Sequence, residues 1–60
     1  MNAVQRREAL SRCLTETPCP VSATALAQRF SVSRQIIVGD IALLRAAGAN
    51  IVSTPRGYLV

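Results

Sequence analysis

The side chains best suited to chemistry in this chain are hydrogen-bond donors at its centre and near its end. Ser33, Arg34 and Gln35 are consecutive, and Arg45 and Arg56 follow. Arginine presents a planar fork of N–H donors that fits a phosphate or the edge of guanine, and glutamine can pair with adenine through two hydrogen bonds. These residue types indicate non-covalent recognition of an anionic partner, with nucleic acid as the first hypothesis.

The chain holds few groups that could catalyse a reaction or bind a metal. It has no histidine, and its only carboxylates are Glu8, Glu16 and Asp40. Cys13 and Cys19 have no second pair of ligands at zinc spacing. General acid–base catalysis needs a richer set of groups. We therefore expect no enzyme and no metal, cofactor or small-molecule site in these residues.

The charge balance also favours an anionic partner. The formal net charge is +4, and all seven positive side chains are arginine. A basic surface binds a polyanion because binding releases counterions. A general bias toward arginine is the alternative explanation, so charge alone favours nucleic acid only modestly. Arg34, Arg45 and Arg56 add weight because they fall beside the elements expected to contact DNA.

The segment from Leu26 to Leu44 predicts two short helices joined by a tight turn. The inward stripe of the earlier helix consists of Ala23, Leu26, Ala27 and Phe30, and that of the later helix of Ile37, Ile41 and Leu44. Between them Val32 is expected to be an apolar plug and Ser33 an N-cap. This is the organisation of a helix-turn-helix, whose second helix enters the DNA major groove.

The face of the later helix that points away from this stripe is nearly uncharged. This outer face consists of Gln35, Val38, Gly39, Ala42 and Ala46. A solvated face usually carries Lys and Glu, and Gly39 costs about 1 kcal/mol relative to alanine in a helix. We therefore expect the outer face to lie against a duplex, where Val38 can meet a thymine methyl group and Arg45 makes a backbone or surface contact rather than reading a base. The alternative is a helix packed against another protein domain.

The remaining segments predict one helix before this pair and a β-hairpin after it. The first helix spans about Ala3 to Glu16, with Leu10, Cys13 and Leu14 inward and Arg6, Arg7, Glu8 and Arg12 mostly in water. Ser22 is expected to cap the second helix after a short extended contact at Val21. The third helix spans about Arg34 to Ala47 and stops at a left-handed Gly48. Asp40, at the edge of the buried stripe, is expected to form a structural salt bridge with an arginine.

The chain after Gly48 changes to the pattern of short strands. Ile51 to Ser53 and Tyr58 to Val60 are β-prone, and Thr54 to Gly57 fits a type I turn with Arg56 at its tip. Tyr58 is expected to pack beneath this wing. Three helices and a hairpin define a winged helix-turn-helix, mainly α with a small β-hairpin, spanning residues 1–60 as one domain. Arg56 is expected to contact the DNA backbone or minor groove, or, alternatively, to be a solvated loop residue.

From about Arg6 to Leu59 the chain resembles the N-terminal winged-helix domains of bacterial regulators, which include those of biotin repressors and DeoR-type repressors. The resemblance is carried by Leu26, Ala27, Phe30, Val32 to Gln35, Ile37, Asp40, Ile41, Leu44, Arg45, Gly48, Ile51 and Arg56 to Leu59. A closer similarity is to the niacin-responsive (3H-domain) repressors of NAD biosynthesis, which carry a run similar to Val32 to Ala46 and a similar final Arg56 to Leu59. Gly39 departs from this pattern, since related sequences tend to have a longer polar side chain there.

The resemblance implies the N-terminal, DNA-binding domain of a bacterial homodimeric repressor, with double-stranded DNA as its partner. The lack of a signal peptide or a long apolar run predicts a cytoplasmic protein without membrane association. The residues expected to contact DNA are Ser33, Arg34, Gln35, Val38, Arg45 and Arg56. In that family a C-terminal domain with three histidines binds metal and senses nicotinic acid, so these ligands and the main dimer interface are expected outside this chain. The alternatives are a protein-interaction winged helix and the regulatory domain of a bifunctional biotin ligase.

Overall fold

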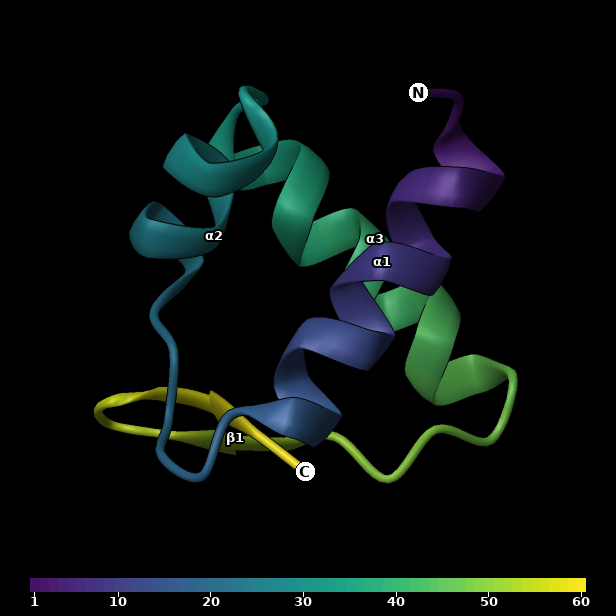
Figure 1. Cartoon of the computed structure of the whole chain (residues 1–60). Coiled ribbons are helices and arrows are strands. Elements are labelled where there is room, and N and C mark those ends of the chain that lie inside the picture. Colours follow the sequence, from purple (N-terminus) through teal and green to yellow (C-terminus); the bar gives the residue numbers. More distant parts are fainter.

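Three helices followed by one β-hairpin make up the protein, in a computed structural model that describes residues 1–60 (Figure 1). The elements are α1 (Ala3–Glu16), α2 (Ala23–Phe30), α3 (Arg34–Ala46), β1 (Val52–Thr54) and β2 (Gly57–Leu59). This is the predicted winged helix-turn-helix, mainly helical with a two-stranded antiparallel sheet. None of the helices combines the length and the apolar character needed to span a membrane.

Each helix begins at a residue whose side chain satisfies a free backbone N–H. Ser22 and Ser33 each accept a hydrogen bond of 3.1 Å from the backbone N–H three residues later, so both predicted caps are confirmed. The capping box of α1, in which Asn2 and Gln5 bond reciprocally to each other's backbone N–H, was not predicted. Each cap stabilises its helix by about 1 kcal/mol.

The helices α2 and α3 end in the same kind of reversal. After α3 the chain turns at Gly48, whose φ of 102° confirms the predicted left-handed residue, although the helix ends at Ala46 rather than Ala47. After α2 the left-handed position is taken by Ser31, with φ of 56°. The N–H of Val32 then bonds to the carbonyl oxygen of Ala27 at 3.0 Å, which closes the turn between the two helices.

One apolar core joins the three helices to the hairpin. Its buried members are Leu10, Leu14, Leu26, Ala27, Ile37, Ile41 and Ile51, and the partly buried residues packed against it include Ala23, Phe30, Val32, Leu44 and Tyr58. The predicted inward stripes and the apolar plug at Val32 are therefore confirmed. Cys13 also packs against the core, as expected, whereas Cys19 is exposed.

The hairpin is shifted by one residue from the prediction. Its register pairs Val52 with Leu59 and Thr54 with Gly57, so that Ile51 and Val60 lie outside the strands. The Ile51 side chain is buried in the core, and the backbone begins to pair only after it. The predicted strand bounds were wrong by one residue, because the side chain of Ile51 is buried in the core and the backbone pairs only from Val52 onward.

The segment between α1 and α2 runs beside the hairpin and is bonded to it (Figure 1). Val21 exchanges two backbone hydrogen bonds with Tyr58, of 2.9 and 2.8 Å, which confirms the predicted extended contact. The approach is so close that a Cβ at Gly57 would lie 2.4 Å from the Val21 carbonyl group, and Gly57 has φ of 137°. Only glycine fits at this position, and the tie holds the hairpin against the start of α2.

Asp40 on α3 is the one charged residue in the core. Its carboxylate accepts two hydrogen bonds from Arg6, of 2.5 Å from Nε and 3.0 Å from Nη2, and Nη1 of Arg7 lies 3.6 Å away. The expected salt bridge is confirmed. The expectation that Arg6 and Arg7 mostly face water was wrong, since both are partly buried where α1 meets α3. Hydrogen bonding from Arg6 outweighs burial and holds the pKa of the Asp40 carboxyl below its usual value.

Asp40→Asn should therefore change how stability depends on pH. Because the folded state has the lower pKa, the contribution of Asp40 is complete above the unfolded value of about 3.9 and is lost as the pH falls below it. We expect Asp40→Asn to lower the free energy of unfolding at neutral pH by about 1–3 kcal/mol and to flatten its decline in acid. Urea unfolding across acidic and neutral pH measures both effects.

Glu8→Gln is the matched control, because Glu8 is exposed on α1 and forms no ion pair. It removes the same charge without removing a contact. If the free energy of unfolding of Asp40→Asn fell as steeply in acid as that of the parent protein, this would contradict the role assigned to Asp40.

Candidate nucleic-acid interface

The outer face of α3 is open to solvent from one end of the helix to the other. Its members Gln35, Val38, Gly39, Ala42 and Ala46 are all exposed, whereas Ile37 and Ile41 on the opposite side are buried. The hairpin does not cover this face, and the chain's own core does not enclose it. The prediction of a bare, accessible face is confirmed.

Nothing in the packing of the domain requires a glycine at position 39. A Cβ built there would have no atom within 4 Å beyond the local helix, and the backbone is not left-handed. Glycine in a helix interior costs about 1 kcal/mol relative to alanine. Gly39 therefore lowers stability without a benefit to the fold, which directs attention to a partner that approaches this surface.

Exposed apolar side chains lie on the outer face and beside it. Val38 is 47% exposed, Ile36 is 41% exposed and Leu43 is 56% exposed. No role was predicted for Ile36 and Leu43. They occur at i and i+7, which places both on the same flank of α3, and this spacing was the available signal.

Arg34 and Arg45 lie at opposite ends of α3 and differ in what they contribute to the fold. Arg45 is in the last turn, where a cation interacts favourably with the helix dipole. Arg34 is the first residue, at the positive end, and no acidic residue in the first turn offsets it. A cation there is unfavourable by about 0.3–1 kcal/mol, while the same position attracts an anion such as phosphate.

The structure brings Arg34 and Arg56 to one hollow, although 22 positions separate them in the chain. The hollow has a volume of about 210 Å³, and its lining includes Ser22 and Ala23 at the start of α2 together with both arginines. Ser22 was predicted only as a helix cap. Because the wing, the start of α2 and the start of α3 meet here, the two arginines can act on neighbouring groups of one partner.

The tip of the hairpin is held by Thr54. Its Oγ1 accepts a hydrogen bond of 3.2 Å from the N–H of Arg56 and donates one of 2.8 Å to the carbonyl oxygen of Gly57. Pro55 and Arg56 both have negative φ, which excludes the mirror-image hairpin turns and agrees with the predicted type I turn. The exposed Arg56 is thus presented from a braced turn.

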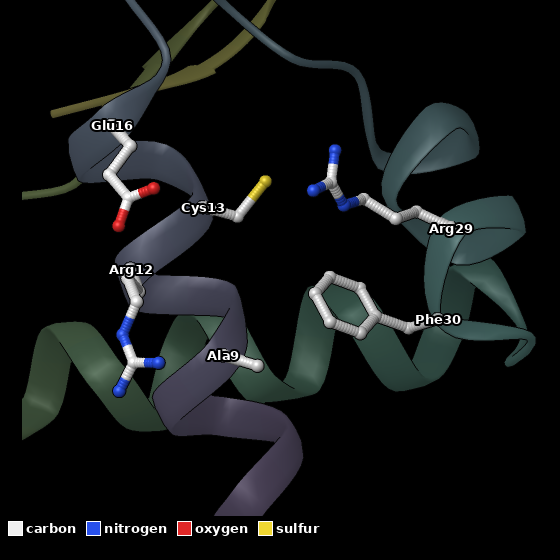
Figure 2. A pocket seen from close by; sticks show the side chains of 6 residues that line it. All are labelled: Ala9, Arg12, Cys13, Glu16, Arg29 and Phe30. Carbon is white, nitrogen blue, oxygen red and sulfur yellow. The ribbon is translucent and has the colours of Figure 1, made fainter.

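A second hollow, of about 150 Å³, lies between α1 and α2 (Figure 2). Figure 2 shows the Cys13 sulfur directed across it toward Arg29, with the ring of Phe30 beside them. Neither Arg29 nor the nearby Glu16 forms an ion pair, and no three potential metal ligands gather anywhere in the structure. This hollow presents no set of groups with a common chemical use.

Charge is distributed unevenly over the molecule. The four arginines beyond α1 are Arg29, Arg34, Arg45 and Arg56, and all are exposed. The single acidic side chain in the same region is Asp40, which is 3% exposed and paired. Glu8 and Glu16 lie on α1. The exposed surface of α3 and the hairpin therefore carries positive side chains and no acidic one, which favours a polyanion. Arg29 on α2 lies apart from it, in the hollow that it shares with Glu16.

The chain is similar in sequence to known proteins. The family model described as the HTH domain matches residues 6–59. The chain is 52% identical over 56 residues to the probable transcription repressor NiaR of Thermotoga maritima, an alignment that covers 93% of the chain and 32% of that protein. It is 43% identical over 54 residues to the transcription repressor NadR of Bacillus subtilis, with 90% and 30% covered. The chain thus spans about a third of the length of these curated relatives.

Gly39→Ala should stabilise the protein. The new methyl group meets open space, so only the gain in helix propensity remains, and we expect the free energy of unfolding to rise by about 0.5–1 kcal/mol. Urea unfolding measures the change, with Ala42→Gly on the same exposed face as the reverse control. A loss of stability in Gly39→Ala would show that the backbone is constrained at this position.

Proposed function

The chain belongs to the HTH domain family, and from this membership we propose that it binds double-stranded DNA in a sequence-dependent manner within a bacterial transcriptional repressor. In this proposal α3 enters the major groove with its outer face toward the bases, and the wing lies along the backbone. The observation that carries the proposal is the exposed surface of α3 and the hairpin, which carries Arg34, Arg45 and Arg56 and no exposed acidic side chain.

The positions of the predicted contact residues support different roles for them in binding DNA. Arg34 and Arg56 share one hollow, so we assign both to phosphates of one strand. Gln35 and Val38, on the outer face, are assigned to base edges. Ser33 uses a lone pair to cap α3, and its hydroxyl proton stays free to donate to a phosphate.

We also propose that this repressor controls genes of NAD biosynthesis and that it is not an enzyme. The support is the resemblance to niacin-responsive repressors and the fact that both relatives are named as transcription repressors. Binding of nicotinic acid and metal, and dimerisation, are assigned to parts of such a repressor beyond these 60 residues. The composition agrees with this assignment, because a chain without histidine has few donors for a metal.

A protein-docking surface is the second candidate, favoured by the exposed side chains of Ile36, Val38 and Leu43. Salt separates the two functions. We expect the affinity for duplex DNA to fall steeply between low and physiological salt, because phosphate contacts release counterions. Fluorescence anisotropy with promoter DNA from NAD-biosynthesis genes, and with random DNA for comparison, measures this. Binding that is absent, or indifferent to salt, would falsify the proposal.

Arg34→Ala and Arg56→Ala should each weaken binding to all sequences alike. If each arginine neutralises a phosphate, each substitution reduces the slope of log affinity against log salt by about one. Arg12→Ala is the matched control, since it removes an exposed arginine from α1 and should leave the slope nearly unchanged. A loss confined to particular sequences would instead assign the substituted arginine to a base edge.

A further inference from the structure

We infer that α3 recognises its target chiefly through the methyl groups of thymine, so that most of the contacted base pairs are A·T or T·A. This rests on the proposed DNA binding and goes beyond it, since it names the chemistry by which the sequence is distinguished. It follows from what the outer face of α3 presents, what it lacks and how close a duplex can come.

The outer face offers apolar contact and almost no hydrogen bonding. Gln35 is its only polar side chain, and the carboxylate of Asp40 is turned inward and occupied by Arg6. In the major groove guanine is usually recognised by Arg or Lys and cytosine by Asp or Glu, whereas thymine is recognised by apolar contact with its methyl group. Val38 is half exposed, and Ile36 on the neighbouring flank is 41% exposed. Only thymine presents a matching apolar group to these side chains.

The arginines beside the face lie at its two ends rather than along it, and we assign them to the DNA backbone. Arg34 shares its hollow with Arg56 and with the start of α2, away from the middle of the outer face. Arg45 is in the last turn of α3, where its charge interacts with the helix dipole. Positive charge at the two ends of an uncharged face matches a duplex, in which phosphates flank the groove and base edges form its floor.

Gly39 lets a short side chain reach that floor. Valine extends little from the helix, so Val38 touches a methyl group only if the backbone of α3 comes close to the bases. Gly39, next to Val38, and Ala42, three residues later, project little or nothing on the outer face, and the space above Gly39 is open. Gly39 is thus a specificity-determining position, although it has no side chain.

The test uses the chain and short duplexes selected by it from a random-sequence pool. Replacing thymine by uracil within the selected site removes the methyl groups and leaves the hydrogen-bonding pattern intact. We expect the affinity to fall about fourfold for each contacted methyl group, the factor that corresponds to about 0.8 kcal/mol. Restoring a methyl group as 5-methylcytosine in a C·G pair at the same position should recover part of the loss.

A double-mutant cycle links the effect to the protein. Val38→Ala should weaken binding to the thymine duplex and lose less than the parent protein when uracil replaces thymine. Val4→Ala is the matched control, because it makes the same change at an exposed position on α1. Gly39→Ala should also reduce the sensitivity to uracil while raising stability.

The outcomes separate this inference from the proposed function. Selected sites rich in contacted G·C pairs, or affinities that uracil leaves unchanged, would overturn the thymine inference while salt-dependent DNA binding stands. An equal uracil effect in the parent protein and Val38→Ala would remove Val38 from the recognition. Failure to bind any duplex would overturn both proposals.

Discussion

The ion pair between Asp40 and Arg6 is the interaction on which the exposed face of α3 depends. A buried carboxylate is tolerated only with a partner, and the two hydrogen bonds from Arg6 supply it while joining α1 to α3. The same pairing takes the only acidic side chain of α3 out of the exposed surface. One contact thus fixes the position of the helix and leaves its outward side free of negative charge.

The wing owes its position to a different constraint, the close approach of two backbones. Gly57 lies against the backbone of Val21, and Tyr58 is hydrogen-bonded to Val21. The hairpin is therefore tied to the chain just before α2. This tie brings Arg56 into the hollow that Arg34 also lines. Positive charge therefore collects where three elements meet, while Glu8 and Glu16 remain on α1.

Two features of α3 lower the stability of a small domain without improving its packing. Gly39 occupies open space in a helix, and Arg34 places a cation at the positive end of the helix dipole. Arg45 differs from Arg34, because a cation in the last turn of a helix interacts favourably with the helix dipole. A local rule broken with no gain inside the fold is the expected mark of a functional surface. Both violations lie where a duplex is proposed to bind.

Interactions within a few residues of each other were predictable from the sequence. The helices, the caps at Ser22 and Ser33, the left-handed Gly48 and the two sides of α3 follow from periodicity and from local hydrogen bonds. Three features were decided only by the tertiary structure. Arg6 is the main partner of Asp40, the side chain of Ile51 lies in the core rather than in a strand, and Arg34 and Arg56 line the same hollow. Each of these outcomes joins residues far apart in the chain or depends on how the core fills. Local patterns carry no information about such distances, because they are set only when all elements pack together.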